Sequence, residues 1–95
     1  MVFLTDRAAD RLEEMLDANH AGPAEGVRVV PIAPGRIGLI VDVPHEGDEV
    51  IERDEQPLLI VDSTLVEVLQ AAEIDSTTVV VAGEPYTEFT VRPAA

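Results

Sequence analysis

The sequence predicts an α+β β-sandwich of short, mostly antiparallel or mixed strands, with two helices packed to one side. Apolar residues recur at helical spacing in two segments, which indicates two amphipathic helices. Several short apolar runs are separated by turn residues, and the short connections between them favour antiparallel pairing. The 95 residues suit a single domain, spanning 1–95, with one hydrophobic core.

The first helix is expected over residues 6–19, "DRAADRLEEMLDAN". Thr5 precedes it as a suitable N-cap, because its hydroxyl can accept a hydrogen bond from a free backbone N–H. Gly22 and Pro23 are expected to end it. The predicted buried stripe consists of Ala8, Leu12, Met15 and Leu16.

The second helix is expected to begin near Ser63 or Thr64. Thr64 and Glu67 have the spacing of a capping box, in which each side chain satisfies a backbone N–H of the other. The predicted buried stripe of this helix consists of Leu65, Val68, Leu69 and Ala72.

A hairpin is expected from strands near 27–33 and 37–43, joined by the turn Pro34-Gly35-Arg36, where glycine can supply a positive φ. Pro31 indicates a sheet edge or a bulge, because proline cannot donate to a strand ladder.

Further strands are expected in the second half. The polar zone 44–57 contains "DEVIER", whose alternation predicts a short outer strand with charges that protect a sheet edge. The continuous apolar run "PLLIVD", 57–62, predicts a central strand buried on both faces. "STTVVVAG" and "YTEFTVR" predict a final pair, joined by the turn Gly83-Glu84-Pro85.

The charge of the chain disfavours two classes of partner. Nineteen acidic residues face six arginines and no lysine, for a formal charge of −13. This charge repels nucleic acid and an anionic membrane surface. It is typical of a highly soluble protein or a saline cytoplasm, and the alternative is an acidic face that docks a basic partner.

The composition also bears on chemistry and location. Cysteine is absent, which excludes disulfides, thiolate nucleophiles and thiolate metal ligands. No apolar stretch approaches the roughly 18 residues of a membrane helix. The start "MVFLTDRAAD" becomes acidic too early for a signal peptide, so we expect a cytoplasmic protein.

The sequence does not predict an enzyme or a cofactor. The two serines, Ser63 and Ser76, lie at expected element boundaries and outside any nucleophile-elbow pattern. No glycine loop for phosphate and no HExxH motif occurs. Tyr86 is interpreted as a strand residue, and His20 as an exposed residue at the end of the first helix.

The acidic segment after the predicted hairpin offers the alternative of a metal site. Carboxylates and an imidazole close together in a turn can hold a hard divalent cation, although the spacing is not that of an EF-hand. The same groups can instead bind a small ligand. The candidate residues of this alternative are His45, Glu46, Asp48 and Glu49.

The order of motifs resembles the HesB/IscA-like family of A-type iron–sulfur cluster carriers. The resemblance extends over nearly the whole chain, and none of its pieces is specific alone. It rests on "LTDRAADRLEEML", "GVRVV", "GRIGLIVD", "GDEVIE", "LLIVDSTLVEVL" and "FTVRP", in that order. It implies the fold of this family and a context in iron–sulfur cluster biosynthesis.

The resemblance also implies where cluster ligands would stand. In cluster-carrying members one cysteine follows the first glycine of the hairpin motif, and two more form a C-terminal Cys-Gly-Cys. Here the hairpin motif reads Gly35-Arg36-Ile37-Gly38, and "RPAA", 92–95, offers no counterpart to the second motif. An arginine has no lone pair for a metal.

Arg36 is therefore interpreted as an exposed hairpin residue, or else as an anchor for an acidic ligand or a subunit contact. The resulting expectation is a non-catalytic domain without cluster ligands, acting through protein contacts, with the homodimer that the resemblance implies.

Overall fold

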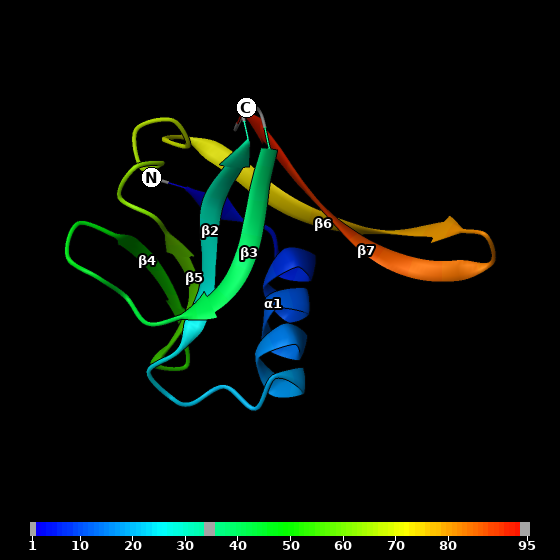
Figure 1. Cartoon of the computed structure of the whole chain (residues 1–95), viewed down its shortest axis with the longest axis horizontal. Coiled ribbons are helices and arrows are strands. Elements are labelled where there is room, and N and C mark those ends of the chain that lie inside the picture. The colour runs from blue at the N-terminus through cyan, green and yellow to red at the C-terminus, as the bar shows by residue number, and fades with distance from the viewer. Residues whose placement is uncertain (1, 34–35, 94–95) are drawn as a thin grey trace.

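The described part of the chain folds into two β-sheets and one α-helix (Figure 1). The structure is a computed structural model that describes residues 2–33 and 36–93. The elements are β1 (Phe3–Leu4), α1 (Asp6–Ala18), β2 (Gly26–Ala33), β3 (Arg36–Asp42), β4 (Glu49–Arg53), β5 (Gln56–Val61), β6 (Ala72–Val81) and β7 (Glu84–Pro93). The predicted α+β class is thus confirmed, but only one of the two predicted helices forms.

The two sheets have different sizes and share the helix. The larger sheet has the strand order β3-β2-β5-β4, and the smaller has the order β1-β6-β7. The hairpin pairs β2–β3, β4–β5 and β6–β7 are antiparallel, whereas β2 with β5 and β1 with β6 pair parallel. Helix α1 contacts β6 of one sheet and both β2 and β5 of the other, so it covers a core that the two sheets share.

The buried core of the described residues is aliphatic. Leu12 of α1 packs there with Val27 and Val29 of β2 and with Leu59 and Val61 of β5. Strand β5 lies between β2 and β4 and is buried almost throughout, which confirms the central strand predicted at 57–62. Strand β4 lies at the edge of the sheet, as the charges of "DEVIER" predict.

The first helix is confirmed with its predicted cap. The Thr5 side chain accepts a hydrogen bond from the Ala8 N–H, and three of the four stripe residues are buried, Met15 being half-buried. The helix ends at Ala18, before the predicted Gly22, because His20 adopts a φ of 53°, which is incompatible with a continuing helix. Within the described ranges, no helix is long and apolar enough to span a membrane.

The second predicted helix is wrong. The segment after β5 forms successive turns, which Asp62 initiates in place of Thr64: its carboxylate accepts hydrogen bonds from the Thr64 N–H and hydroxyl. Leu65 and Leu69 are buried as predicted, but Val68 is 74% exposed. The two leucines pack into the core and so fix the position of this segment. A capping box describes local hydrogen bonds only, so its spacing did not predict this packing.

The β2–β3 hairpin is confirmed. Val27 pairs with Val41, and the register shifts between Pro31 and Ala33, so the irregularity predicted at Pro31 is present. Arg36 pairs with Ala33 and belongs to β3 rather than to the turn. The predicted turn residues Pro34 and Gly35 lie outside the described residues.

The final strand pair is confirmed with a different turn. Val81 pairs with Glu84, so the turn consists of Ala82 and Gly83, and the predicted turn residues Glu84 and Pro85 belong to β7. Both turn residues have a positive φ, 52° and 82°, as the twist of a two-residue hairpin turn requires.

Candidate functional site

The hairpin motif places three of its four residues in β3. Arg36, Ile37 and Gly38 pair through their backbones with Ala33, Pro31 and Val30 of β2. Gly35 lies outside the described residues. The role predicted for Arg36, as an exposed residue, an anchor or a subunit contact, stays a prediction.

The structure does not bring the four candidate metal ligands together. The Asp48 carboxylate is buried against Arg28, and its oxygens accept the backbone N–H groups of His45 and Ser63. The Glu49 carboxylate is bound elsewhere, where Oε1 accepts the Val2 N–H at 3.0 Å. Within residues 2–33 and 36–93, no group of three or more His, Asp or Glu side chains could hold a metal ion.

An ion-pair cluster around Arg28 lies where this acidic segment meets the larger sheet. The Arg28 side chain is 3% exposed. Its Nε lies 2.8 Å from Asp42 Oδ2, its Nη2 2.7 Å from Asp48 Oδ2, and its Nη1 3.0 Å from Asp62 Oδ1. Nη2 also donates to the Val43 carbonyl at 2.8 Å. We call Arg28 and its three aspartates the Arg28 cluster.

Hydrogen bonds and charge stabilise the ionised form of every member of the Arg28 cluster. The Asp48 carboxylate, above all, raises the pKa of Arg28. The pKa of Asp48 is lowered chiefly by Arg28, that of Asp42 chiefly by the Val43 N–H, and that of Asp62 chiefly by the Thr64 hydroxyl.

The Arg28 cluster therefore holds several segments of the chain together. It joins β2 to the end of β3, to the segment before β4 and to the segment after β5. Sequence reasoning missed it. The available signal was a charged residue, the second of the otherwise apolar run "VRVVPIA", which predicts either an outward side chain or a buried, paired one.

A second buried carboxylate, Asp75 of β6, fastens the start of α1. Its oxygens accept the Thr5 hydroxyl at 2.6 Å, the Arg7 Nε–H at 2.6 Å and the Ser76 N–H at 2.8 Å. Arg7, with help from Thr5, holds the pKa of Asp75 far below its usual range. The predicted N-cap thus also links the helix to the smaller sheet.

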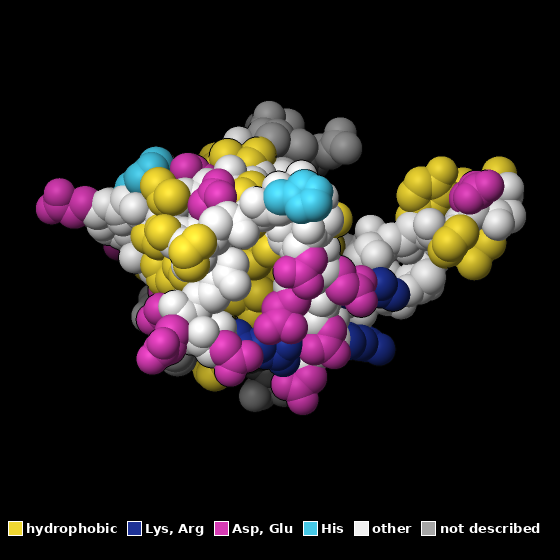
Figure 2. Space-filling model, turned by 90° about the horizontal axis from the view of Figure 1, so that it is seen from below, with side chains coloured by type: hydrophobic (Ala, Val, Ile, Leu, Met, Phe, Trp, Pro, Cys, Tyr) yellow, Lys and Arg dark blue, Asp and Glu magenta, His cyan; other side chains and the backbone are white. Residues whose placement is uncertain are grey.

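The outer end of the β6–β7 pair carries exposed apolar side chains on both of its faces. Beyond the pairing of β1 with Glu73 and Ile74, these two strands project past α1 as a two-stranded ribbon (Figure 1). Val80, Val81 and Tyr86 near its end are 71%, 57% and 55% exposed. Hydrophobic side chains gather there in Figure 2. We call these three residues the ribbon patch. Tyr86 is a strand residue, as predicted.

Comparisons with known proteins identify the fold. SufA of Escherichia coli, involved in biosynthesis of iron–sulfur clusters, superposes with a TM-score of 0.60 at 22% identity, covering 94% of this chain and 83% of SufA. A protein of Aquifex aeolicus gives 0.59 at 26% identity, covering 94% and 87%. IscA with a 2Fe–2S cluster gives 0.57 at 17% identity, covering 95% and 84%.

No protein-family model matches the chain, and no curated protein matches it in sequence. The structural superpositions, rather than sequence comparisons, confirm the resemblance drawn from the order of motifs. The chain has the HesB/IscA-like fold of the iron–sulfur cluster assembly proteins SufA and IscA, in a form that contains no cysteine.

Proposed function

We propose that this chain is a non-catalytic HesB/IscA-like domain that acts through protein contacts and does not carry an iron–sulfur cluster. The observation that carries the proposal is the combination of a SufA- and IscA-like fold with the complete absence of cysteine. The proposed context is still iron–sulfur cluster biosynthesis, by analogy with these neighbours.

The donor groups of the chain do not fit a cluster. Iron–sulfur clusters are held by cysteine thiolates, with histidine replacing some of them in Rieske centres. This chain has two histidines and no thiolate. Arginine stands at the hairpin position where the family resemblance implies a cysteine, and it cannot donate electrons to iron. A cluster delivered to this fold would therefore lack the sulfur ligands that it needs.

Anaerobic reconstitution with ferrous iron and sulfide tests this proposal. After desalting, we expect substoichiometric iron and sulfide and no cluster absorption band, because no thiolate is available. A cysteine-containing SufA treated in parallel provides the positive control. A stable product with stoichiometric iron and sulfide would overturn the proposal.

The ribbon patch supports protein contacts as the mode of action. Exposed apolar side chains that gather at one place are typical of interaction sites. Val80, Val81 and Tyr86 lie on strands that project from the body, where a partner can approach them from several sides (Figure 1). We propose a second copy of this chain as the partner, which forms a homodimer.

The molar mass in solution tests the homodimer. By sedimentation equilibrium we expect twice the 10.2 kDa of the chain. The variant V80T/V81T/Y86T keeps strand-forming residues, removes apolar surface, and is expected to weaken dimerisation at least tenfold. V68T, at an exposed valine outside the ribbon, is the matched control. A wild-type monomer at high concentration would contradict the homodimer, as would equal weakening by V68T.

The remaining expectations stay predictions. Exclusion of nucleic acid and of anionic membranes follows from the charge of −13. We also propose a cytoplasmic location and a role without enzymatic activity.

A further inference from the structure

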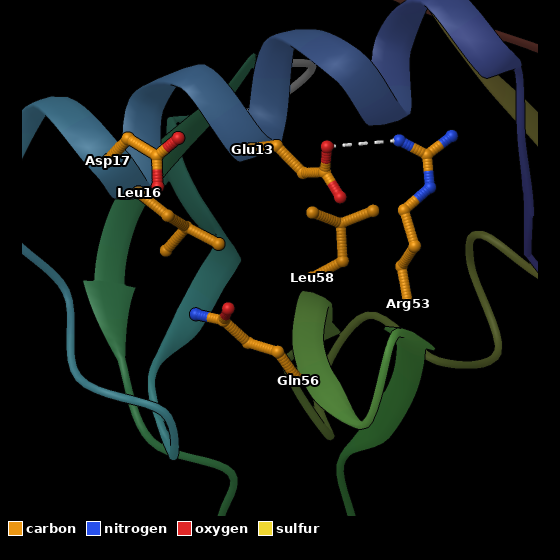
Figure 3. A pocket seen from close by; sticks show the side chains of 6 residues that line it. All are labelled: Glu13, Leu16, Asp17, Arg53, Gln56 and Leu58. Carbon is orange, nitrogen blue, oxygen red and sulfur yellow. Dashed lines mark ion pairs between the residues drawn. The ribbon is translucent and has the colours of Figure 1, made fainter.

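A cavity of about 230 Å³ lies between α1 and the β4–β5 hairpin (Figure 3). This volume is below the roughly 300 Å³ at which pockets for drug-sized ligands begin, so the cavity suits a single side chain. It is lined by Glu13, Leu16, Asp17, Arg53, Gln56 and Leu58. We call it the α1–β5 cavity.

The cavity combines an apolar floor with an acidic wall. Leu16 of α1 and Leu58 of β5 supply the floor, and both belong to the hydrophobic core. Glu13 and Asp17 lie one turn apart on α1, so their carboxylates line the same side. In Figure 3 both carboxyl groups extend from the helix above the leucines.

The amide of Gln56 adds another acceptor. Its Nε2 donates to the Gly22 and Glu25 carbonyl oxygens at 3.4 and 3.3 Å, which uses the donor end of the side chain and assigns the amide orientation. The Oε1 atom remains as an acceptor beside the leucine floor (Figure 3). The amide and the helix carboxylates thus offer acceptors to an occupant of this cavity.

The arginine that lines the cavity is already engaged. Arg53 Nη1 lies 2.9 Å from Asp10 Oδ1 and 3.2 Å from Glu13 Oε2, and Asp10, above all, raises the pKa of this guanidinium. Asp10 and Glu13 therefore share this one arginine, and the carboxylate of Asp17 lines the cavity in addition, which leaves an excess of negative charge there.

We propose that the α1–β5 cavity binds a lysine or arginine side chain of a partner protein. The methylene stem of such a side chain packs on Leu16 and Leu58, and its charged head donates to Asp17, Glu13 and the Gln56 oxygen. An anionic group is repelled by the acidic wall, and an apolar group desolvates the carboxylates without donating to them. The charge of the chain leaves open an acidic face that docks a basic partner. This proposal locates such a face at the α1–β5 cavity.

Methyl NMR spectroscopy with short peptides tests the proposal. The probes are Gly-Gly-Xaa-Gly-Gly peptides with acetylated and amidated ends, where Xaa is lysine, arginine, norleucine or citrulline. We expect saturable shifts of the Leu16 and Leu58 methyl groups and of the Gln56 side-chain amide with the lysine and arginine peptides, and no saturable shift with the two uncharged ones. Saturation with norleucine, or no shift with any peptide, would overturn the proposal.

Two variants separate the cavity from the overall charge. E13Q/D17N neutralises two cavity carboxylates, and we expect it to weaken binding of the arginine peptide at least tenfold. E46Q/E67Q makes the same charge change on exposed residues elsewhere, and we expect it to change the affinity for the arginine peptide less than twofold. Equal weakening by both pairs would show attraction by net charge alone and contradict the proposal. If E13Q/D17N does not fold, the methyl shifts of the wild type still decide.

The outcome of the peptide-binding experiment is independent of the proposed function. The ribbon patch and the α1–β5 cavity involve different residues. Loss of peptide binding therefore leaves the expected dimer mass unchanged, and a monomeric chain leaves the peptide shifts unchanged.

Discussion

Replacing Arg28 by methionine is expected to lower the free energy of unfolding by about 3 kcal/mol or more, because removing one partner of a buried ion pair leaves the other charges buried without compensation. The carboxylate most affected is Asp48, whose side chain is 2% exposed. Methionine keeps the approximate length of the side chain, so the loss of charge dominates over the loss of volume. Equilibrium denaturation in urea measures the change.

Two further variants make this test specific. Arg11→Met removes an arginine from an exposed pair with Glu14 and is expected to change stability by less than about 1 kcal/mol. Adding Asp48→Asn to Arg28→Met is expected to restore part of the lost stability, because the uncompensated buried charge is then removed. An Arg28→Met protein as stable as the Arg11→Met protein would show that the Arg28 cluster does not fasten the fold.

A steep loss of stability in acid is the second large effect that we expect. Folding lowers the pKa values of Asp42, Asp48, Asp62 and Asp75. A carboxylate with a lowered pKa in the folded state contributes stability above its unfolded pKa and loses it as the pH falls through the folded value. Since the unfolded pKa of aspartate is near 4, stability is expected to be full at neutral pH and to fall below about pH 4.

Denaturation curves recorded between neutral pH and about pH 2 measure this dependence. D48N/D75N removes the two buried carboxylates and is expected to be less stable than wild type at neutral pH, with a shallower fall in acid. Asp54→Asn, on the exposed β4–β5 turn, controls for the loss of a charge. A fall in acid that is equally steep in D48N/D75N and in wild type would assign the acid sensitivity to other groups.

Local signals predicted much of the fold. Thr5 and the apolar stripe predicted α1, and the apolar run at 57–62 predicted β5. Both predictions succeeded because a helix cap and an apolar stretch involve residues that are close together in the sequence. The same kind of signal misled at Thr64, where the capping-box spacing competed with an aspartate two residues earlier. Strand β1 was missed because two residues that pair in parallel with β6, about 70 positions away, leave no local pattern.

The buried charges show a different limit. Arg28 binds carboxylates that lie between 14 and 34 positions further along the chain. Asp75 binds Thr5 and Arg7 across 70 and 68 positions. With 19 acidic residues in 95, the sequence offers many candidate partners for each arginine. Which of them pair depends on the strand order, which only the folded chain defines.

The sequence by itself determined which donor atoms this protein possesses. It has no thiolate, and it carries a large negative charge, because composition is the same in every conformation of the chain. Only the tertiary structure decided that Asp48 faces Arg28, that three apolar side chains stand at the end of a ribbon, and that Glu13 and Asp17 border a cavity. These arrangements join residues from separate elements, and their distances exist only once the sheets and the helix have packed together.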